Sequence, residues 1–207
     1  YNIEIGCNIP AYKPRKKKIL LKQFHKDEEK PFVKEVALFL IETGVLTETA
    51  RHFLFDERKL SPEVINDLKI VSIDNGYDVV NKLKVKFDDQ ILKDSGIVAN
   101  VNDKLYFRFF TPCLLFPYYN QKKELIGLQS RYLGTNKEAP RFQFVSSQKT
   151  RLFNLPILNT IRKNEDLYIS EGITDCLALL SSGKKAVAIP SATILPQLDL
   201  SLLSGYK

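Results

Sequence analysis

The amino-acid sequence predicts an α/β fold in three successive parts: a helical N-terminal region, a mixed sheet with a β-hairpin, and a strand–helix–strand unit. Three observations predict this fold. Apolar residues recur at helical spacing up to residue 96, and a strand-like alternation replaces that spacing from residue 97. Two short apolar runs then flank one amphipathic run between residues 165 and 193. A chain of 207 residues suits one or two small domains with a hydrophobic core.

Residues 1–30 show little hydrophobic period and carry eight Lys or Arg against four Asp or Glu. Prolines and the basic run Arg15–Lys18 favour an extended, solvated linker, although such a run can also contact a phosphate backbone. Residues 31–207 carry only +3 of the net charge of +7. A basic N-terminal segment followed by a mildly basic remainder fits contact with the phosphates of a nucleic acid. Surface charge that only keeps the protein soluble is the competing explanation.

Short helices are predicted from residue 31 to residue 96. Proline suits a first helical turn, hydroxyl and carboxylate side chains suit N-caps, and glycine suits the residue after a helix. The predicted helices are Pro31–Thr43, a short helix from the N-cap Thr47 through Phe53, a helix starting at Ser61, Tyr77–Phe87, and a last one from the cap Asp88 to Gly96.

Strands are predicted from Ile97 onward. Leu105–Phe110 is rich in aromatic residues, and a polar turn separates the β-prone run Leu114–Tyr119 from Glu124–Leu133, which predicts a hairpin. On the second hairpin strand, alternation predicts one face made of Leu125, Gly127, Gln129 and Arg131.

Arg131, beside Gln129, offers a planar cation for a phosphate group. A surface arginine on a sheet edge is the alternative. Residues 134–160 form a predicted basic loop, and its cations alternate with Phe142 and Phe144, as in a groove for single-stranded template. A solvated loop is the competing explanation. The cations of this loop are Lys137, Arg141, Lys149 and Arg151.

The strand–helix–strand unit has apolar runs at Leu167–Ile169 and Ala186–Ile189. Between them, four apolar residues fall on one helix face, and Gly183 stands where a helix ends. Glu171 follows the first strand at its carboxyl end, where ligands bind in such units, and Asp175 lies four residues on. The pair can hold a divalent metal, or merely complement the positive end of the helix dipole.

Composition excludes several classes of protein. Hydrophobic content of 44% argues against disorder, no secretory signal is visible, and no apolar run approaches the ~20 residues that span a bilayer. Three unclustered cysteines, at 7, 113 and 176, predict buried thiols in a reducing, cytoplasmic compartment and no zinc in this chain. His25 and His52 lack metal-ligand spacing, and no P-loop is present.

The order strand, Glu-Gly-x-x-Asp, helix, Gly, strand, small-residue loop resembles the first half of a Toprim domain. In bacterial-type DNA primases this segment reads close to Glu-Gly-Tyr-Met-Asp-Val and is followed by a Ser-x-Thr loop, which Ser191–Thr193 matches. A second block, Leu115–Tyr118 with Leu125–Arg131, resembles the primase pattern Phe-Pro-Ile, turn, Val-x-Gly-Phe-Gly-Gly-Arg. A third block, Pro140–Phe142 with Leu152–Asn154, resembles the primase segment Pro-Lys-Tyr … Leu-Phe.

The resemblance implies the RNA polymerase core of a bacterial-type primase, or a primase-like protein of a phage or mobile element. Such a core synthesises RNA primers on single-stranded DNA by nucleotidyl transfer, with Mg²⁺ or Mn²⁺, nucleoside triphosphates and a replicative helicase as partners. By the same resemblance Glu171 binds metal, Asp175 supports that site, and Arg131 contacts triphosphate or template. Ser191 and Thr193 line the metal pocket in this interpretation.

The implied organisation is a linker at 1–30, an N-terminal subdomain of the primase core at 31–160, and a truncated Toprim half at 161–207. The subdomain comprises helices at 31–96, a sheet at 97–133 and the basic loop. Toprim metal sites are completed by a later Asp-x-Asp, and the only acid after Asp175 is Asp199. We therefore expect a fragment that is inactive alone.

Two alternatives remain open at this point. Cys113 stands near the place where the family usually has an arginine, and Leu155–Pro156 replaces a common lysine. These departures favour a non-catalytic nucleic-acid-binding module on a primase scaffold. Another Toprim enzyme, such as a nuclease, is the second alternative, and the primase-like hairpin block argues against it.

Overall fold

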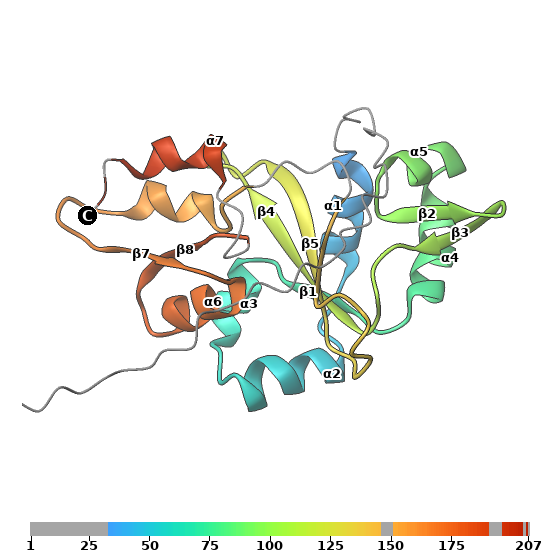
Figure 1. Cartoon of the computed structure of the whole chain (residues 1–207), viewed down its shortest axis with the longest axis horizontal. Coiled ribbons are helices and arrows are strands. Elements are labelled where there is room, and N and C mark those ends of the chain that lie inside the picture. The colour runs from blue at the N-terminus through green and yellow to red at the C-terminus, as the bar shows by residue number, and fades with distance from the viewer. Residues whose placement is uncertain (1–32, 146–150, 191–195, 205, 207) are drawn as a thin grey trace, which may run out of the picture.

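The computed structural model describes residues 33–145, 151–190, 196–204 and 206. Three sheets are laid out along the molecule (Figure 1), with the strand–helix–strand unit at one end and a β2–β3 hairpin at the other. A four-stranded antiparallel sheet of order β1-β4-β5-β6 lies between them. The mixed helix-and-strand architecture predicted from the sequence is confirmed. The predictions for residues 1–30, Cys7, Lys149, Ser191 and Thr193 lie outside the described residues.

Side-chain caps start most of the N-terminal helices. Thr47, Ser61 and Asp88 each accept a hydrogen bond from a backbone N–H three residues on, so the predicted caps Thr47 and Asp88 and the predicted helix start at Ser61 are confirmed. The predicted end of the second helix at Phe53 is wrong, because α2 continues into a π-helical segment, η1. The helices are α1 (Lys34–Thr43), α2 (Glu48–Arg51), η1 (His52–Glu57), α3 (Pro62–Asp67), α4 (Gly76–Lys86) and α5 (Asp89–Asp94).

The predicted hairpin forms the centre of the main sheet. Its strands are β4 (Cys113–Tyr119) and β5 (Leu125–Tyr132), and they pair in register from Cys113 opposite Tyr132. The outer strands are β1 (Val71–Ile73) and β6 (Phe142–Phe144), the second inside the predicted loop. Three-residue strands are too short for a periodic signal, so neither was predicted.

The predicted face of β5 is wrong at one residue. The pairing shifts register between Tyr118 and Tyr119, which is a β-bulge. Leu125 therefore packs in the same core as Leu128, on the face opposite Gln129 and Arg131. Strict alternation cannot anticipate this change, because a bulge inserts one extra residue on one strand only.

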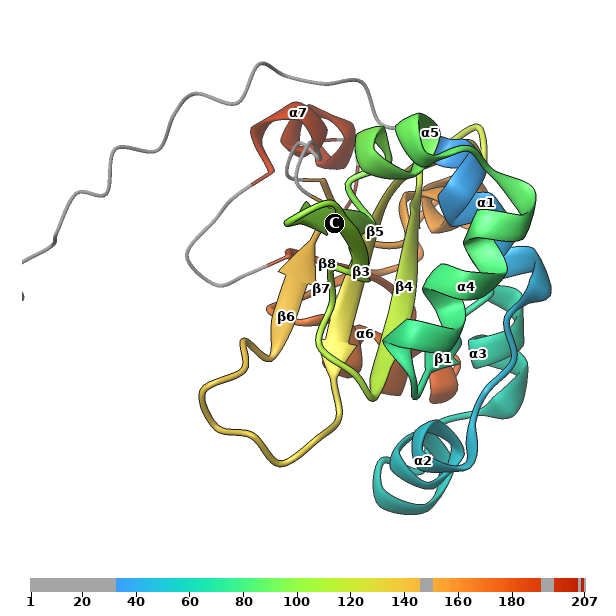
Figure 2. The ribbon, with the colours of Figure 1, turned by 90° about the vertical axis from the view of Figure 1, so that its right-hand side faces the viewer.

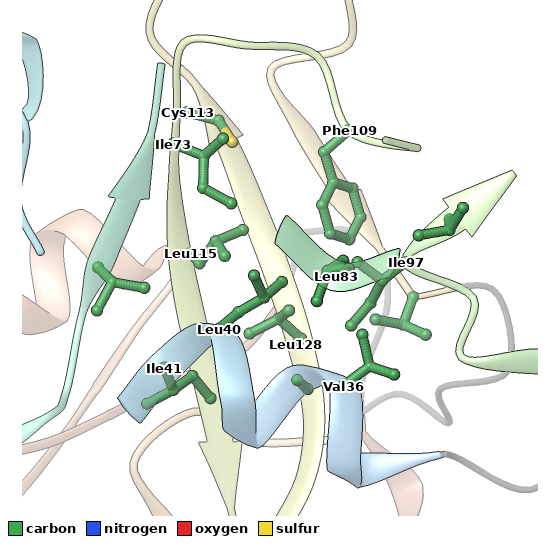
Figure 3. Close-up of a cluster of buried hydrophobic side chains, with 14 of the residues drawn as sticks. Val36, Leu40, Ile41, Ile73, Leu83, Ile97, Phe109, Cys113, Leu115 and Leu128 are labelled. Atoms are coloured by element: carbon green, nitrogen blue, oxygen red, sulfur yellow. The ribbon is translucent and has the colours of Figure 1, made fainter. Parts of the chain in front are cut away.

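Hydrophobic cores cover both faces of the main sheet. The first core packs α1 and α4 against β1, β4 and β5, and Figure 3 shows Leu40, Leu83, Leu115 and Leu128 converging in it. Figure 2 shows α1 and α4 running along this side of the sheet. The second core joins the other face to α6, and in it the Phe116 ring meets Phe153 at 6.2 Å between ring centroids. Polar side chains on that second face are consequently buried.

The strand–helix–strand unit is confirmed. Its elements are β7 (Leu167–Ser170), α6 (Ile173–Ser181) and β8 (Lys185–Ala188), and the two strands pair in parallel. Gly183 has φ +78°, the left-handed conformation that the predicted helix end requires. A backbone hydrogen bond of 2.9 Å from the Phe153 N–H to the Ala188 carbonyl docks β8 onto the segment that follows the main sheet.

The remaining elements are short. They are β2 (Val98–Val101), β3 (Lys104–Phe107), η2 (Leu155–Thr160), α7 (Gln197–Leu200) and η3 (Ser201–Leu203). Within the described ranges, every helix is too short or too polar to cross a membrane.

Candidate nucleic-acid interface

Arg131 lies on the inner strand β5 with only 6% of its surface exposed. Its Nη1 donates a hydrogen bond of 3.1 Å to the Thr174 hydroxyl on α6. Its guanidinium stands 4.6 Å from the centroid of the Phe53 ring and 5.3 Å from that of Phe142. The alternative of a surface arginine on a sheet edge is therefore wrong, because α6 and η1 cover this face of the sheet.

The guanidinium of Arg131 has a lowered pKa and, in the described part of the chain, an incomplete set of hydrogen-bond partners. Burial, together with the nearby Arg141 and Arg58, lowers that pKa to about 10. Asp175 and Glu57 act in the opposite direction. The group is still charged at neutral pH. Its Nε is buried and has no hydrogen-bond partner among the described residues. A desolvated, incompletely paired cation is unfavourable by itself, and an anionic ligand would satisfy it.

A hollow of about 800 Å³ opens beside this cation. Four basic side chains line it, and the acidic Glu48 and Glu57 partly offset them. Phe53 supplies an aromatic surface in its wall. This combination of arginines and an aromatic ring suits a phosphate backbone. The basic lining residues are Arg58, Arg131, Lys137 and Arg141.

The π-helical segment η1 shapes one wall of the hollow. Residues five apart lie above one another in such a segment. Arg58 accordingly stands 5.2 Å above the Phe53 ring, and the His52 Nδ1 lies 3.2 Å from a Glu57 carboxylate oxygen. Sequence reasoning missed Phe53 and Arg58, since the expected helix ended at Phe53 and gave no reason to pair residues five apart.

The opposite wall comes from the end of β5 and the loop after it. Phe142 on β6 pairs with Arg131, and the Tyr132 N–H donates to the Arg141 carbonyl at 2.8 Å. This pairing closes the loop that carries Lys137 and brings the exposed Arg141 beside the buried Arg131. Of the predicted basic set, the structure thus brings Arg131, Arg141 and Lys137 together.

Gln129 has an internal partner instead. It is buried, and its Oε1 accepts a 2.9 Å hydrogen bond from the Tyr118 hydroxyl. Burial raises the pKa of the Tyr118 phenol, so this group remains a neutral donor. Gln129 is not among the residues that line the hollow. Its predicted contact with nucleotide stays a prediction.

Arg151 is engaged in an ion pair away from the hollow. Its Nε donates to both carboxylate oxygens of Asp199, at 2.9 and 3.0 Å, and its Nη2 lies 2.8 Å from one of them. The fully buried Asp199 also accepts the Leu152 N–H at 2.7 Å. The observed geometry gives Arg151 a structural role in joining the segment after residue 150 to α7.

Glu171 and Asp175 lie where the sequence predicted, just after β7 and in the first turn of α6, and both are exposed. Gly172 between them has an extended backbone, φ −153°, and a Cβ built there would lie 3.6 Å from the Asp175 Oδ2. No group of three or more His, Cys, Asp or Glu able to hold a metal occurs within the described residues. Two carboxylates fit Mg²⁺ when substrate phosphates and water supply its other ligands.

Thr174 connects the carboxylates to the hollow. It occupies a variable position inside Glu-Gly-x-x-Asp, so the motif gave no reason to single it out. Its hydroxyl accepts the hydrogen bond from Arg131, and the next residue, Asp175, acts electrostatically on that same cation. The basic hollow and the carboxylate pair therefore adjoin.

Comparisons with known proteins identify relatives of this chain. The family model described as DNA primase catalytic core, N-terminal domain, matches residues 40–168. A DNA primase of Lactococcus lactis subsp. lactis is 28% identical over 167 residues, which are 76% of this chain and 26% of that protein. A DNA primase of Clostridium acetobutylicum is 30% identical over 122 residues, which are 56% of this chain and 20% of that protein. The chain thus spans about a quarter or less of the length of these relatives.

Solved primase structures share the fold. The zinc-binding and RNA polymerase domains of the Aquifex aeolicus primase match with a TM-score of 0.70 and 20% identity, over 92% of this chain and 48% of that one. The RNA polymerase domain of the Mycobacterium tuberculosis primase, in complex with a double-stranded DNA oligomer with a 6-nucleotide overhang, matches with a TM-score of 0.67 and 18% identity, over 83% and 56% of the two chains. A primase catalytic domain bound to ssDNA matches with a TM-score of 0.64 and 21% identity, over 77% and 56%.

Proposed function

Because the chain belongs to the family of the DNA primase catalytic core, N-terminal domain, we propose that it forms part of an enzyme that synthesises RNA primers on single-stranded DNA. The observation that carries the proposal is the position of Arg131, a buried cation with an unpartnered Nε that is linked through Thr174 to the Glu171–Asp175 carboxylate pair. Nucleotidyl transfer joins a 3′-hydroxyl to an α-phosphate and releases pyrophosphate. It therefore needs cations for phosphates and carboxylates for a metal ion, close together.

The hollow beside Arg131 is the proposed binding site for template or incoming triphosphate. Arg58, Lys137 and Arg141 provide charge at its surface. Phe53 provides an aromatic wall that holds the guanidinium groups of Arg58 and Arg131. Two of the similar structures hold single-stranded DNA or DNA with a single-stranded overhang, which supports the same use here. Exposed cations attract the strand, and the buried Arg131 fixes one phosphate in place.

The carboxylate pair is the proposed place for a divalent cation. Glu171 would hold Mg²⁺ or Mn²⁺ directly, and Asp175 would support that site from the first turn of α6. A bound ion would supply Lewis-acid stabilisation of the reacting phosphate and the leaving pyrophosphate. Within the chain, Thr174 orients the Arg131 guanidinium, and Arg131 in turn neutralises charge beside Asp175.

We further propose that residues 31–160 form the N-terminal subdomain and residues 161–207 the first part of a Toprim domain. The parallel β7–α6–β8 unit with Glu171 at the carboxyl end of β7 supports the second assignment. Nucleoside triphosphates and a replicative helicase are the partners that this function requires.

A non-catalytic nucleic-acid-binding module is the second candidate, and one observation favours it. Cys113, which stands near the place where the family usually has an arginine, is fully buried in the first core. A buried thiol cannot contact a phosphate, so Cys113 cannot take over the role of that arginine.

Primer synthesis by the complete gene product on single-stranded DNA, with Mg²⁺ or Mn²⁺, distinguishes these functions. We expect labelled RNA products from the wild type and none from Glu171→Gln. Asp166→Asn, which removes another exposed acid near β7, serves as the matched control and should retain synthesis. Retained DNA binding without synthesis by the wild type would leave the binding module, and degradation of the template would indicate a nuclease.

A further inference from the structure

A second groove, of about 730 Å³, lies at the other end of the strand–helix–strand unit from Glu171. Lys185 at the start of β8 pairs with Leu167 at the start of β7, whereas Glu171 follows the end of β7. The groove is therefore separate from the proposed catalytic site. It is lined by the end of α3, the end of β4 with its turn, the segment from Phe153 to Thr160, and the junction of α6 and β8.

The rim of this groove is basic. Lysine supplies four of its lining residues, and Asp67 is the one acidic residue among them. Lys185 is occupied, since its Nζ donates to the Thr160 carbonyl at 2.7 Å and lies 3.6 Å from a Glu165 carboxylate oxygen. In the described part of the chain, no acidic side chain forms an ion pair with the other three. These are Lys69, Lys123 and Lys184, all exposed.

The groove between the lysines is mainly apolar. Leu68, Pro117, Ile157 and Leu180 line it, together with the half-buried ring of Tyr119. The ring of Phe153 also borders the groove but is only 1% exposed, so it offers no open face for a base. The hollow beside Arg131 differs, because arginines supply three of its four cations and lysines supply all four in the groove. Lysines around an apolar lining suit carboxylates beside aliphatic side chains.

The groove is held in shape by its own hydrogen bonds. The Asn159 Nδ2 donates to the Gln121 carbonyl at 2.6 Å, which ties η2 to the turn that carries Lys123. Lys69 and Lys123 have left-handed backbones, with φ of 53° and 61°. Glycine or asparagine adopts that conformation with less strain, so the backbone gives no reason for lysine at either place. Lys59, outside the groove, has the same backbone conformation, so the case for a ligand depends on the charge and lining of the groove.

We propose that this groove binds an acidic, aliphatic peptide segment of a partner protein. Carboxylates of the segment pair with the lysine rim, and an aliphatic side chain packs against the apolar lining between α3 and η2. Lysine ammonium groups act as point charges and do not require the planar geometry of an arginine–phosphate pair. The proposal does not depend on the primer-synthesis function, because none of its residues belongs to the catalytic site.

A titration of the full chain with a short fluorescein-labelled peptide, in which Glu alternates with Leu, tests this proposal. Fluorescence anisotropy should show saturable binding that weakens when salt is raised. Lys123→Gln combined with Lys184→Gln should weaken binding about 3- to 10-fold, the size expected for two exposed ion pairs. The matched control is Lys84→Gln combined with Lys86→Gln on α4, two exposed lysines outside the groove, and it should bind normally.

Two further probes separate charge from shape. A peptide with Ser in place of Leu should bind several-fold more weakly, and Ile157→Ser should weaken binding of the Leu peptide while circular dichroism shows the native fold. The proposal is overturned if the wild type shows no saturable binding of the peptide. It is also overturned if the groove double variant and the α4 double variant weaken binding to the same extent. A third contradicting result is that an oligothymidylate displaces the peptide and the Lys123→Gln, Lys184→Gln variant loses as much affinity for the oligothymidylate as for the peptide.

Discussion

Arg131 on β5 donates a hydrogen bond of 3.1 Å to Thr174 on α6, although 43 residues separate them in the sequence. This contact joins the main sheet to the strand–helix–strand unit at the point where the exposed carboxylates stand. It places a buried cation within electrostatic range of Asp175 and next to the basic hollow. The contact thus brings the proposed phosphate-binding groups next to the proposed metal-binding carboxylates.

Replacing Arg131 with methionine should leave the free energy of unfolding unchanged or raise it, by up to about 2 kcal/mol. The reason is that burial of this cation is unfavourable, and an apolar side chain of similar length keeps the packing against Phe53. Urea denaturation followed by circular dichroism measures the change. A decrease of more than about 3 kcal/mol in the free energy of unfolding would show that Arg131 mainly stabilises the fold.

Thr174→Val removes the hydroxyl that accepts the Arg131 hydrogen bond and preserves the shape of the side chain. We expect affinity for single-stranded DNA to fall about 2- to 5-fold, in line with one hydrogen bond of about 1 kcal/mol. Thr174→Ser should bind like the wild type, because it retains the hydroxyl. Equal affinities for the valine and serine variants would mean that Thr174 does not position the arginine.

The pair Arg151–Asp199 should behave as a buried ion pair. Arg151→Met leaves the buried Asp199 carboxylate without its cation and should cost about 3–5 kcal/mol of unfolding free energy. Adding Asp199→Leu should restore part of that loss. Urea denaturation of both single variants and the double variant measures the coupling. Additive losses would contradict the paired role and would return Arg151 to the list of candidate template contacts.

The two buried cysteines should be inert at neutral pH. Burial raises the pKa of the Cys113 and Cys176 thiols from 9.0 to about 12. The unfolded chain releases these protons near pH 9 and the folded chain near pH 12, so both thiols should lower stability as the pH rises through that window. Iodoacetamide with peptide mass spectrometry should modify both only after urea is added. Rapid modification of either cysteine in native protein would contradict its burial.

Local patterns predicted much of this fold because the relevant information lies close in sequence. The caps Thr47 and Asp88, the helix start at Ser61 and the helix end at Gly183 each depend on a few neighbouring residues, and each was predicted. The face assigned to Leu125 was wrong because the bulge depends on how two strands pair.

The candidate site was predicted in part for the same reason. Arg131, Glu171 and Asp175 belong to short motifs, so their positions could be inferred. The burial of Arg131 results from packing of α6 and η1 over the sheet, and the contributions of Phe53 and Thr174 depend on that packing. Arg151 shows the converse, since nothing in its local sequence indicates the Asp199 carboxylate 48 residues away.

The most direct test of the proposed function compares two variants of the complete gene product, Arg131→Met and Glu171→Gln, in two assays on single-stranded DNA. The account predicts that both variants lose primer synthesis, and that only Arg131→Met also loses affinity for the DNA, about 10-fold or more. Primer synthesis by either variant at the wild-type rate would contradict the assignment of that residue. Wild-type affinity in Arg131→Met would contradict the claim that this buried cation binds the nucleic acid.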